Sequence, residues 1–125
     1  MAGSFKDLKV YQLAFEAAIL IHTISNAFPK GEKYSLTDQI RRSSRSVCAN
    51  IGEAYRKRIY PKHFTSKITD ADGEATETSI WLDFALEFGY VSKENFSFLQ
   101  TKYVEIGRML NSMANKPEKF LPKTT

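Results

Sequence analysis

The chain has 125 residues, of which 42% are hydrophobic and 26% charged, and a formal net charge of +4. This length and composition are those of one globular domain, which excludes a disordered chain. Its one cysteine excludes an internal disulfide, and no apolar run is long enough to cross a bilayer, so we expect a cytoplasmic protein with no membrane partner.

Two amphipathic segments fill the N-terminal half of the chain. Apolar residues spaced by three or four predict a helix over residues 6–28, ended by Pro29 and Gly31. A second apolar stripe predicts a helix over 35–58, with Ser35 or Thr37 as its N-cap. Small residues lie between the apolar positions of this second helix and indicate close packing of helix backbones. They are Ser43, Ser44, Cys48, Ala49, Gly52 and Ala54.

A third pattern predicts a helix over residues 61–88. Pro61 suits the first turn of this helix, and Gly89 fits a C-terminal cap. The segment has two apolar sides, which is more than packing against one neighbouring helix requires. The second side is formed by Trp81, Phe84, Ala85 and Phe88.

The fourth pattern predicts a helix over 92–115 that opens with Ser92 and repeats apolar residues at spacings of three and four. Residues 116–125 are polar, contain two prolines and are expected to form a flexible tail. No run of useful length alternates as a strand would. Because short links force successive helices to alternate in direction, we expect residues 5–115 to form an all-α, antiparallel up-down-up-down four-helix bundle.

Several sequence runs along the chain carry a resemblance to a known family. They are KDLKVYQLA, FPKGEKYSLTDQIRRSS, LEFGYVS and the run Ser46-Val47-x-x-Asn50-Ile51-x-Glu53. Over roughly residues 5–115 the chain resembles the four-helix-bundle family named after the protein encoded in 23S ribosomal RNA intervening sequences, the ribosomal S23-like family. The resemblance implies an up-down-up-down bundle and, as in characterised relatives, a ring-shaped homopentamer. A related branch includes the accessory protein of diversity-generating retroelements, which looks like a basic pentamer that binds nucleic acid and a reverse transcriptase.

The chain departs from the family's usual pattern in the second and third predicted helices. Relatives commonly have Pro at the position of Cys48, and Ala-Glu-Gly at positions 52–54, where this chain has Gly-Glu-Ala. They also commonly have a second acidic residue near Ser79. These departures leave the expected fold intact, but they leave open the details of the second helix, including any kink that the Pro would cause.

Charge is unevenly distributed along the sequence. Residues 41–67 carry eight basic residues and one acid, whereas residues 68–94 carry seven acids and one lysine. The basic residues recur on one helical face and continue into the following loop, with Tyr55 and Tyr60 among them, which favours a phosphate-binding surface. The candidate nucleic-acid-binding residues are Arg41, Arg45, Arg56, Lys57, Arg58 and Lys62.

A second interpretation is open for the arginines inside the helix. Arg41, Arg42 and Arg45 could be solvated, or could pair with acids of the third helix that share one side of it. Those acids are Asp70, Glu74 and Glu77. The loop cluster around Lys57 favours nucleic acid over pairing.

Asn50 and Glu53 lie beside the apolar Ile51, where a fully solvated position is awkward. A buried carboxylate there could serve as a general base, but such groups more often fix the register of packed helices. We therefore expect a structural polar network, of which a buried contact from Arg42 to Glu53 or Glu77 is one specific form. Its members are Arg42, Asn50, Glu53 and Glu77.

Sites for metals and catalysis receive no support from the sequence. The run from Asp70 to Glu74 resembles the start of a calcium loop, but Ala75 stands where that loop requires glycine. The two histidines, His22 and His63, come from distant segments without a second histidine at ligand spacing. Cys48 has no CxxC partner and is expected to be inert. We expect no cofactor and no enzyme activity.

The surplus apolar residues of the first and third helices suit a subunit interface. They are Phe15, Ile19, Trp81, Phe84 and Phe88. The sequence thus predicts a non-catalytic homo-oligomeric scaffold, a pentamer by resemblance, whose basic surface binds structured RNA or DNA. The alternative is a protein–protein adaptor ring of unknown partner, in which the arginines are structural.

Overall fold

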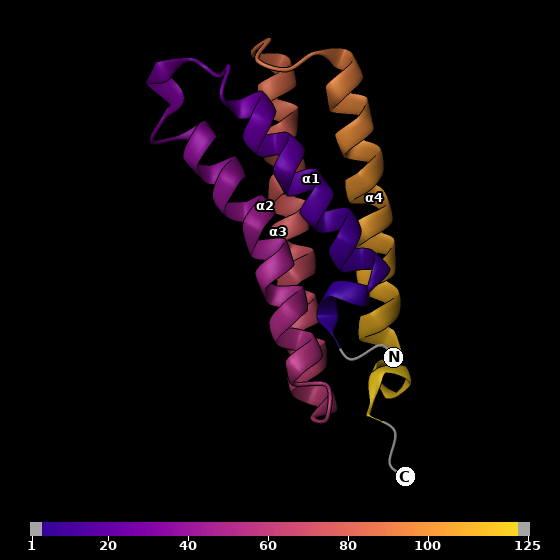
Figure 1. Ribbon diagram of the computed structural model, residues 1–125. Helices are drawn as coiled ribbons and strands as arrows, with labels where there is room; N and C mark the ends of the chain where they lie inside the picture. The colour runs from indigo at the N-terminus through magenta and orange to yellow at the C-terminus, as the bar shows by residue number, and fades with distance from the viewer. Residues whose placement is uncertain (1–3, 123–125) are drawn as a thin grey trace.

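In the computed structural model, which describes residues 4–122, the chain forms four long α-helices and three short 3-10 helices, and these residues contain no strand (Figure 1). The long helices are α1 (Lys9–Ser25), α2 (Leu36–Arg56), α3 (Pro61–Glu87) and α4 (Lys93–Asn115). The 3-10 helices are η1 (Phe5–Asp7), η2 (Lys30–Glu32) and η3 (Pro117–Phe120).

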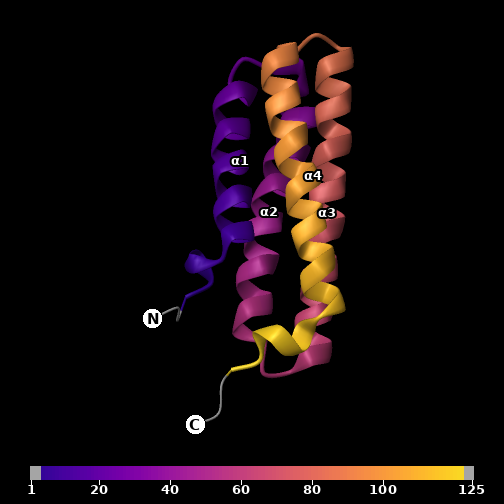
Figure 2. The same ribbon diagram turned by 90° about the vertical axis from the view of Figure 1, so that its right-hand side faces the viewer.

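Each long helix packs against the next one in the chain, and α1 also packs against α4, which closes the bundle (Figures 1 and 2). The links at residues 57–60 and 88–92 are short, so α2, α3 and α4 alternate in direction. The η1 and η3 turns lie at the same end of the bundle as the α2–α3 link (Figure 1). The expected all-α, antiparallel four-helix bundle is confirmed.

The core follows the apolar stripes that the sequence predicts. Ile40, Val47 and Ile51 of α2 are completely buried and meet equally buried side chains of the other three helices. Each such side chain contributes about 1.5–3 kcal/mol when it leaves water, so these stripes supply most of the driving force for bundle formation. The large buried side chains from the other helices are Ile21, Phe64, Ile68, Leu82, Leu99, Ile106 and Leu110.

Helix α1 is about one turn shorter at each end than the predicted range 6–28. At its start, Leu8 adopts an extended conformation (φ −71°, ψ 129°) that separates the η1 turn from the helix. At its end, Ala27 and Phe28 donate to carbonyls three residues back, as in a tight turn. Pro29 explains this ending, because a proline disfavours the α conformation in the residue before it.

The start of α2 is capped differently from the sequence expectation. The Ser35 side chain makes no capping hydrogen bond, and Thr37 lies inside the helix. Instead, Glu32 Oε1 accepts from the Leu36 backbone N–H at 3.3 Å and from the Ser35 hydroxyl at 2.6 Å. These hydrogen bonds, with one from the Tyr90 hydroxyl, lower the pKa of Glu32 below its ordinary value. An acidic side chain therefore caps α2 and ties it to the start of the α3–α4 link.

The caps of α3 and α4 agree with the sequence pattern. Gly89 follows α3 with φ +77°, a conformation that other residues rarely adopt, and Tyr90 N–H donates to the Ala85 carbonyl at 2.8 Å. Ser92 caps α4 by accepting from the Asn95 backbone N–H at 3.1 Å.

Part of the segment 116–125, expected to be a flexible tail, is ordered. The η3 turn follows α4, and the ring of Phe120 stacks on the buried Phe64, with ring centroids 5.4 Å apart. Burial of one aromatic ring explains why these residues depart from the expectation, since Phe120 adds apolar contact to the end of the core. Residues 123–125 lie outside the described residues.

Candidate nucleic-acid interface

A groove of about 680 Å³ runs along the outer face of α2 and the loop before it. Residues three and four apart share one face of a helix, so the arginines gather there together with the small side chain of Ala49, which leaves room between them. Thr37 also lines the groove, and its buried hydroxyl has no hydrogen-bond partner within residues 4–122. The lining residues are Lys33, Tyr34, Thr37, Asp38, Arg41, Arg42, Arg45, Ser46 and Ala49.

Arg41 and Arg45 are held by neutral groups of α1. Arg41 donates from Nε to the Ser25 hydroxyl at 2.7 Å and from Nη2 to the Asn26 side-chain oxygen at 2.9 Å. Arg45 Nη2 lies 3.1 Å from Nδ1 of His22. Neither arginine forms an ion pair with an acid of residues 4–122, so both charges remain uncompensated at the surface.

Arg42 differs from its two neighbours because it pairs with acids of α3. Its Nη1 lies 3.1 Å from Glu74 Oε2, and its Nη2 contacts Glu77. The hydrogen bonds to Glu74 raise the pKa of the Arg42 guanidinium above its ordinary value. Of the three helical arginines, this one fits the pairing interpretation.

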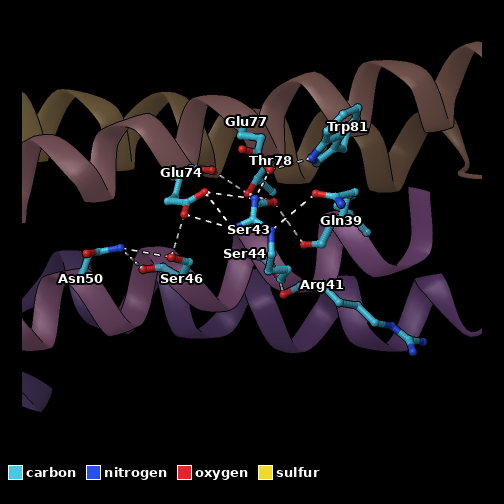
Figure 3. Close-up of polar contacts among 12 residues, drawn as sticks. Gln39, Arg41, Ser43, Ser44, Ser46, Asn50, Glu74, Glu77, Thr78 and Trp81 are labelled. Atoms are coloured by element: carbon cyan, nitrogen blue, oxygen red, sulfur yellow. Dashed lines mark hydrogen bonds and ion pairs between the residues drawn. The ribbon is translucent and has the colours of Figure 1, made fainter. Parts of the chain in front are cut away.

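Glu74 and Glu77, the partners of Arg42, also belong to a larger polar network between α2 and α3, which includes Ser46, Asn50 and Trp81 (Figure 3). The Ser46 hydroxyl donates to Glu74 at 2.9 Å, and Asn50 Nδ2 donates to the Ser46 hydroxyl at 3.1 Å. On the other side, Trp81 Nε1 donates to Glu77 at 3.1 Å. The structure thus brings Arg42, Asn50 and Glu77 of the expected network together.

Glu53 lies apart from this network. Its carboxylate contacts Lys67 Nζ at 3.1 Å, and its side chain is half exposed. The reason is its place on α2: it follows Asn50 by three residues and faces the start of α3, where Lys67 rather than Arg42 is within reach. Arg42 therefore contacts Glu77 and not Glu53, and the contact lies at the surface rather than buried, because the Arg42 and Glu77 side chains are 45% and 34% exposed.

Most cations at the end of α2, in the α2–α3 link and in the first turn of α3 are exposed. Arg56, Lys57 and Lys62 project into solvent and make no ion pair within residues 4–122. Arg58 is different, because its Nη1 donates to the Tyr55 carbonyl at 2.9 Å and its guanidinium lies 4.0 Å from the centre of the Tyr55 ring. Arg58 thus closes the end of α2, and the ring of Tyr55, expected to be a stacking group, is buried beneath it.

A second groove, apolar and of about 420 Å³, lies where α3 ends beside the start of α2. Phe84 and Phe88 are 46% and 54% exposed there, and Trp81 is half-buried. On α1, Phe15 and Ile19 are also half exposed, and the ring of Phe15 stacks on Tyr11. Each of these five residues, expected at a subunit interface, leaves apolar surface in contact with water in the single chain.

The groups considered for catalysis have ordinary structural surroundings. Burial raises the pKa of the Cys48 thiol to about 11, so it stays protonated near neutral pH. Among residues 4–122, no three His, Cys, Asp or Glu side chains come close enough together to hold a metal ion. Within the same range, no helix is both long and apolar enough to cross a membrane.

Sequence reasoning missed two parts of this surface. Tyr34 lines the groove along α2 that contains Arg41, Arg42 and Arg45, called the basic groove below. It lies outside every helical stripe and gives no periodic signal. The neutral acceptors Ser25, Asn26 and His22 lie on the last turn of α1 and just beyond it, far from the arginines in sequence, and only the packing of α1 on α2 reveals them. The i, i+4 spacing of Arg41 and Arg45 was the one available signal.

The chain resembles known proteins over most of its length. The family model described as 23S rRNA-intervening sequence protein matches residues 6–112. A crystal structure of a protein with unknown function from the S23 ribosomal protein family of Bacteroides thetaiotaomicron is similar, with 28% sequence identity and a TM-score of 0.76 over 85% of this chain and 95% of that chain. None of the curated proteins matches. Because the family model spans nearly the whole bundle and the folds agree, the chain belongs to the 23S rRNA-intervening sequence protein family.

Proposed function

We propose that this protein is a non-catalytic, oligomeric helical scaffold whose basic surface binds structured RNA or DNA. One observation carries the proposal: along the outer face of α2 and the loop after it, the cations other than Arg42 have no acidic partner within residues 4–122. The unpaired cations are Arg41, Arg45, Arg56, Lys57 and Lys62, and Arg58 adds its charge at the end of the helix.

The spacing of these charges suits a polyanion. Helix α2 has 21 residues and is therefore about 30 Å long, which spans many phosphates of a nucleic-acid backbone. Arg41 and Arg45 are already fixed in position by Ser25, Asn26 and His22. Less side-chain entropy is lost when such pre-positioned groups meet a phosphate, which favours binding.

A non-catalytic role is consistent with the groups that catalysis would need. Glu53 is half exposed and paired with Lys67, so it forms a surface ion pair and does not lie in an enclosed site. Cys48, with its pKa raised to about 11, is not a thiolate near neutral pH. We also propose a cytoplasmic location, where a free thiol stays reduced.

Self-association is part of the proposal. Phe15 and Ile19 on α1, and Trp81, Phe84 and Phe88 on α3, leave apolar surface at two separate places on the bundle. Two different apolar surfaces on one chain can pair with each other between neighbouring subunits, which favours a head-to-tail ring over a two-fold dimer. By resemblance to characterised relatives we expect a pentamer.

The adaptor function remains the second candidate because of the apolar groove beside Trp81. Half-exposed aromatic rings in a groove of about 420 Å³ could hold an apolar side chain of a partner protein. In that case the arginines of α2 would contribute to structure alone, and the affinity for nucleic acid would be low at every salt concentration.

Binding to a labelled hairpin RNA, measured by fluorescence anisotropy between 50 and 200 mM salt, tests the proposal. We expect the affinity to fall by more than about tenfold over this range. Binding releases several salt cations that are condensed on the RNA, and this release becomes less favourable as the salt concentration rises. The combined variant Arg56→Glu, Lys57→Glu and Lys62→Glu should lose most of the affinity. Arg58 is left unchanged because it holds the end of α2.

The matched control reverses three cations of α4, Lys93→Glu, Lys102→Glu and Arg108→Glu, which changes the net charge by the same amount on another face. This control should keep most of the affinity. Light scattering should show that both variants retain the oligomer of the unmodified protein. Unchanged RNA affinity in the loop variant, or equal loss in both variants, would refute a specific role for the α2 surface.

A further inference from the structure

Tyr34 is the most exposed of the large apolar and aromatic side chains within residues 4–122. It lies in the link between η2 and α2, at one end of the basic groove, and 85% of its surface is accessible. The Lys33 ammonium lies 5.2 Å from the centre of its ring. An aromatic ring left in water in this way contributes little to the fold, and the face turned away from the Lys33 ammonium is open to a ligand.

The groove is chemically divided along its length. Asp38 lies between Tyr34 and the two arginines with uncompensated charge, and it makes no ion pair within residues 4–122. A carboxylate at this point repels phosphate but accepts hydrogen bonds from the amino groups of bases. Arg41 and Arg45 follow one and two turns further along α2, where they attract phosphate. The Tyr34 end therefore suits a base, and the arginine end suits the backbone.

We propose that Tyr34 is a stacking platform for one unpaired base of the bound nucleic acid, whose neighbouring phosphates lie on Arg41 and Arg45. This inference rests on the proposed function and narrows it. A base inside a duplex has both faces covered by its neighbours, whereas a base in a loop, bulge or single-stranded end can place a face on an aromatic ring. The favoured ligand is thus a nucleic acid with an unpaired segment, and a blunt duplex binds by its charge alone.

Three RNA probes of similar charge test the inference: an unstructured strand, a hairpin with an unpaired loop, and a blunt duplex of the same stem. Affinities are measured by fluorescence anisotropy at one fixed salt concentration. Tyr34→Ala should weaken binding of the strand and the hairpin by about 5- to 100-fold, the usual effect of losing one stacking ring. Duplex affinity should stay within about twofold, and Tyr34→Phe, which keeps the ring, should retain affinity for all three probes.

Phe98 supplies a matched control because it is also an exposed ring, 52% accessible, with the Lys102 ammonium 5.2 Å from its centre. It lies on α4, in a groove that combines Lys102 and Arg108 with Glu105. Phe98→Ala should leave all three affinities unchanged. Equal losses for Phe98→Ala and Tyr34→Ala would show that any exposed ring beside a lysine has this effect, and would overturn the assignment.

The outcomes separate this inference from the function on which it rests. If the unmodified protein binds none of the probes, both are wrong. If it binds them with a steep salt dependence, and Tyr34→Ala weakens strand, hairpin and duplex equally or not at all, the stacking role is wrong and the basic surface stands. Circular dichroism of each variant establishes that the bundle is intact, which the exposed positions of both rings lead us to expect.

Discussion

Neighbouring arginines of α2 should separate into one that stabilises the fold and one that binds nucleic acid. Arg42→Gln removes the ion pairs to Glu74 and Glu77, whereas Arg45→Gln removes one contact with the His22 ring. The two substitutions change the net charge equally and lie one turn apart on the same helix. Any difference between them must therefore come from what each side chain contacts.

The expected loss of stability follows from the exposure of the pairs. The Arg42 side chain is 45% exposed and that of Glu74 is 22% exposed, so each pair is strongly screened by water. Two such pairs sum to about 1 kcal/mol. Ser46 and Trp81 continue to donate to the two carboxylates, which keeps the loss from growing larger. Arg45→Gln should cost less than about 0.5 kcal/mol, as is usual for an exposed position.

The expected effects on nucleic-acid binding have the opposite order, with a larger effect for Arg45→Gln than for Arg42→Gln. Loss of one phosphate contact at Arg45 should reduce the slope of log affinity against log salt by about 0.9, whereas Arg42→Gln should leave the slope unchanged. Urea unfolding at one protein concentration measures the stabilities, and RNA anisotropy across a salt series measures the slopes. If Arg42→Gln lowers affinity as much as Arg45→Gln, the division of the arginines by their partners is refuted.

Three further substitutions and one alkylation experiment test local features of the structure. Gly73→Ala should stabilise the protein by about 0.5–1 kcal/mol in urea unfolding, because Gly73 is inside α3 and no atom lies within 4 Å of an added Cβ, whereas Gly89→Ala should destabilise it because of the positive φ. Thr37→Val should be neutral or stabilising by up to about 2 kcal/mol, since it removes a buried hydroxyl without a partner, and a clear loss of stability would show that this hydroxyl is bonded. Cys48 alkylation should be slow at pH 8 and accelerate towards pH 11, because the pKa of the thiol is raised to about 11 in the folded state. For the same reason Cys48 contributes stability below about pH 9 that is lost as the pH rises towards 11. Fast alkylation at neutral pH would contradict the raised pKa.

The fold could be predicted because each of its causes is local in sequence. Apolar residues at three- and four-residue spacing fix the buried face of each helix, and Ile40, Val47 and Ile51 are buried as that spacing requires. Pro61 and Gly89 mark the two ends of α3. The ends of α1 were less predictable, because the apolar pattern continues through a tight turn as far as Phe28.

The partners of the polar residues could not be predicted, because they depend on how the helices are rotated and crossed. The sequence placed Arg41 and Arg45 on one face of a helix but left the partner of Arg42 open. Successive residues on a helix are about 100° apart, so Arg42 turns to α3 while Arg41 turns to α1. The same limit explains Glu53, whose neighbour is Lys67.

Gly52 shows how a sequence pattern can suggest a tighter fit than exists. Its place among small residues indicated that helix backbones approach closely there. In the structure, the nearest atoms to an added Cβ belong to the ring of Phe5, at 3.5 Å, which is an ordinary contact distance. What covers Gly52 is the side chain of Phe5, in the η1 turn that packs onto α2, and Phe5 precedes the helix that the sequence predicts over residues 6–28.

The arrangement of charges on α2 has a consequence for how folding and binding are related. Acids of α3 neutralise the arginine that faces them, so that charge serves the contact between two helices. Neutral groups of α1 hold Arg41 and Arg45 in place and leave their charge available. Hydrogen bonds to neutral acceptors thus position the guanidinium groups without screening them from a polyanion. A surface built in this way can bind phosphate without breaking any ion pair that stabilises the bundle.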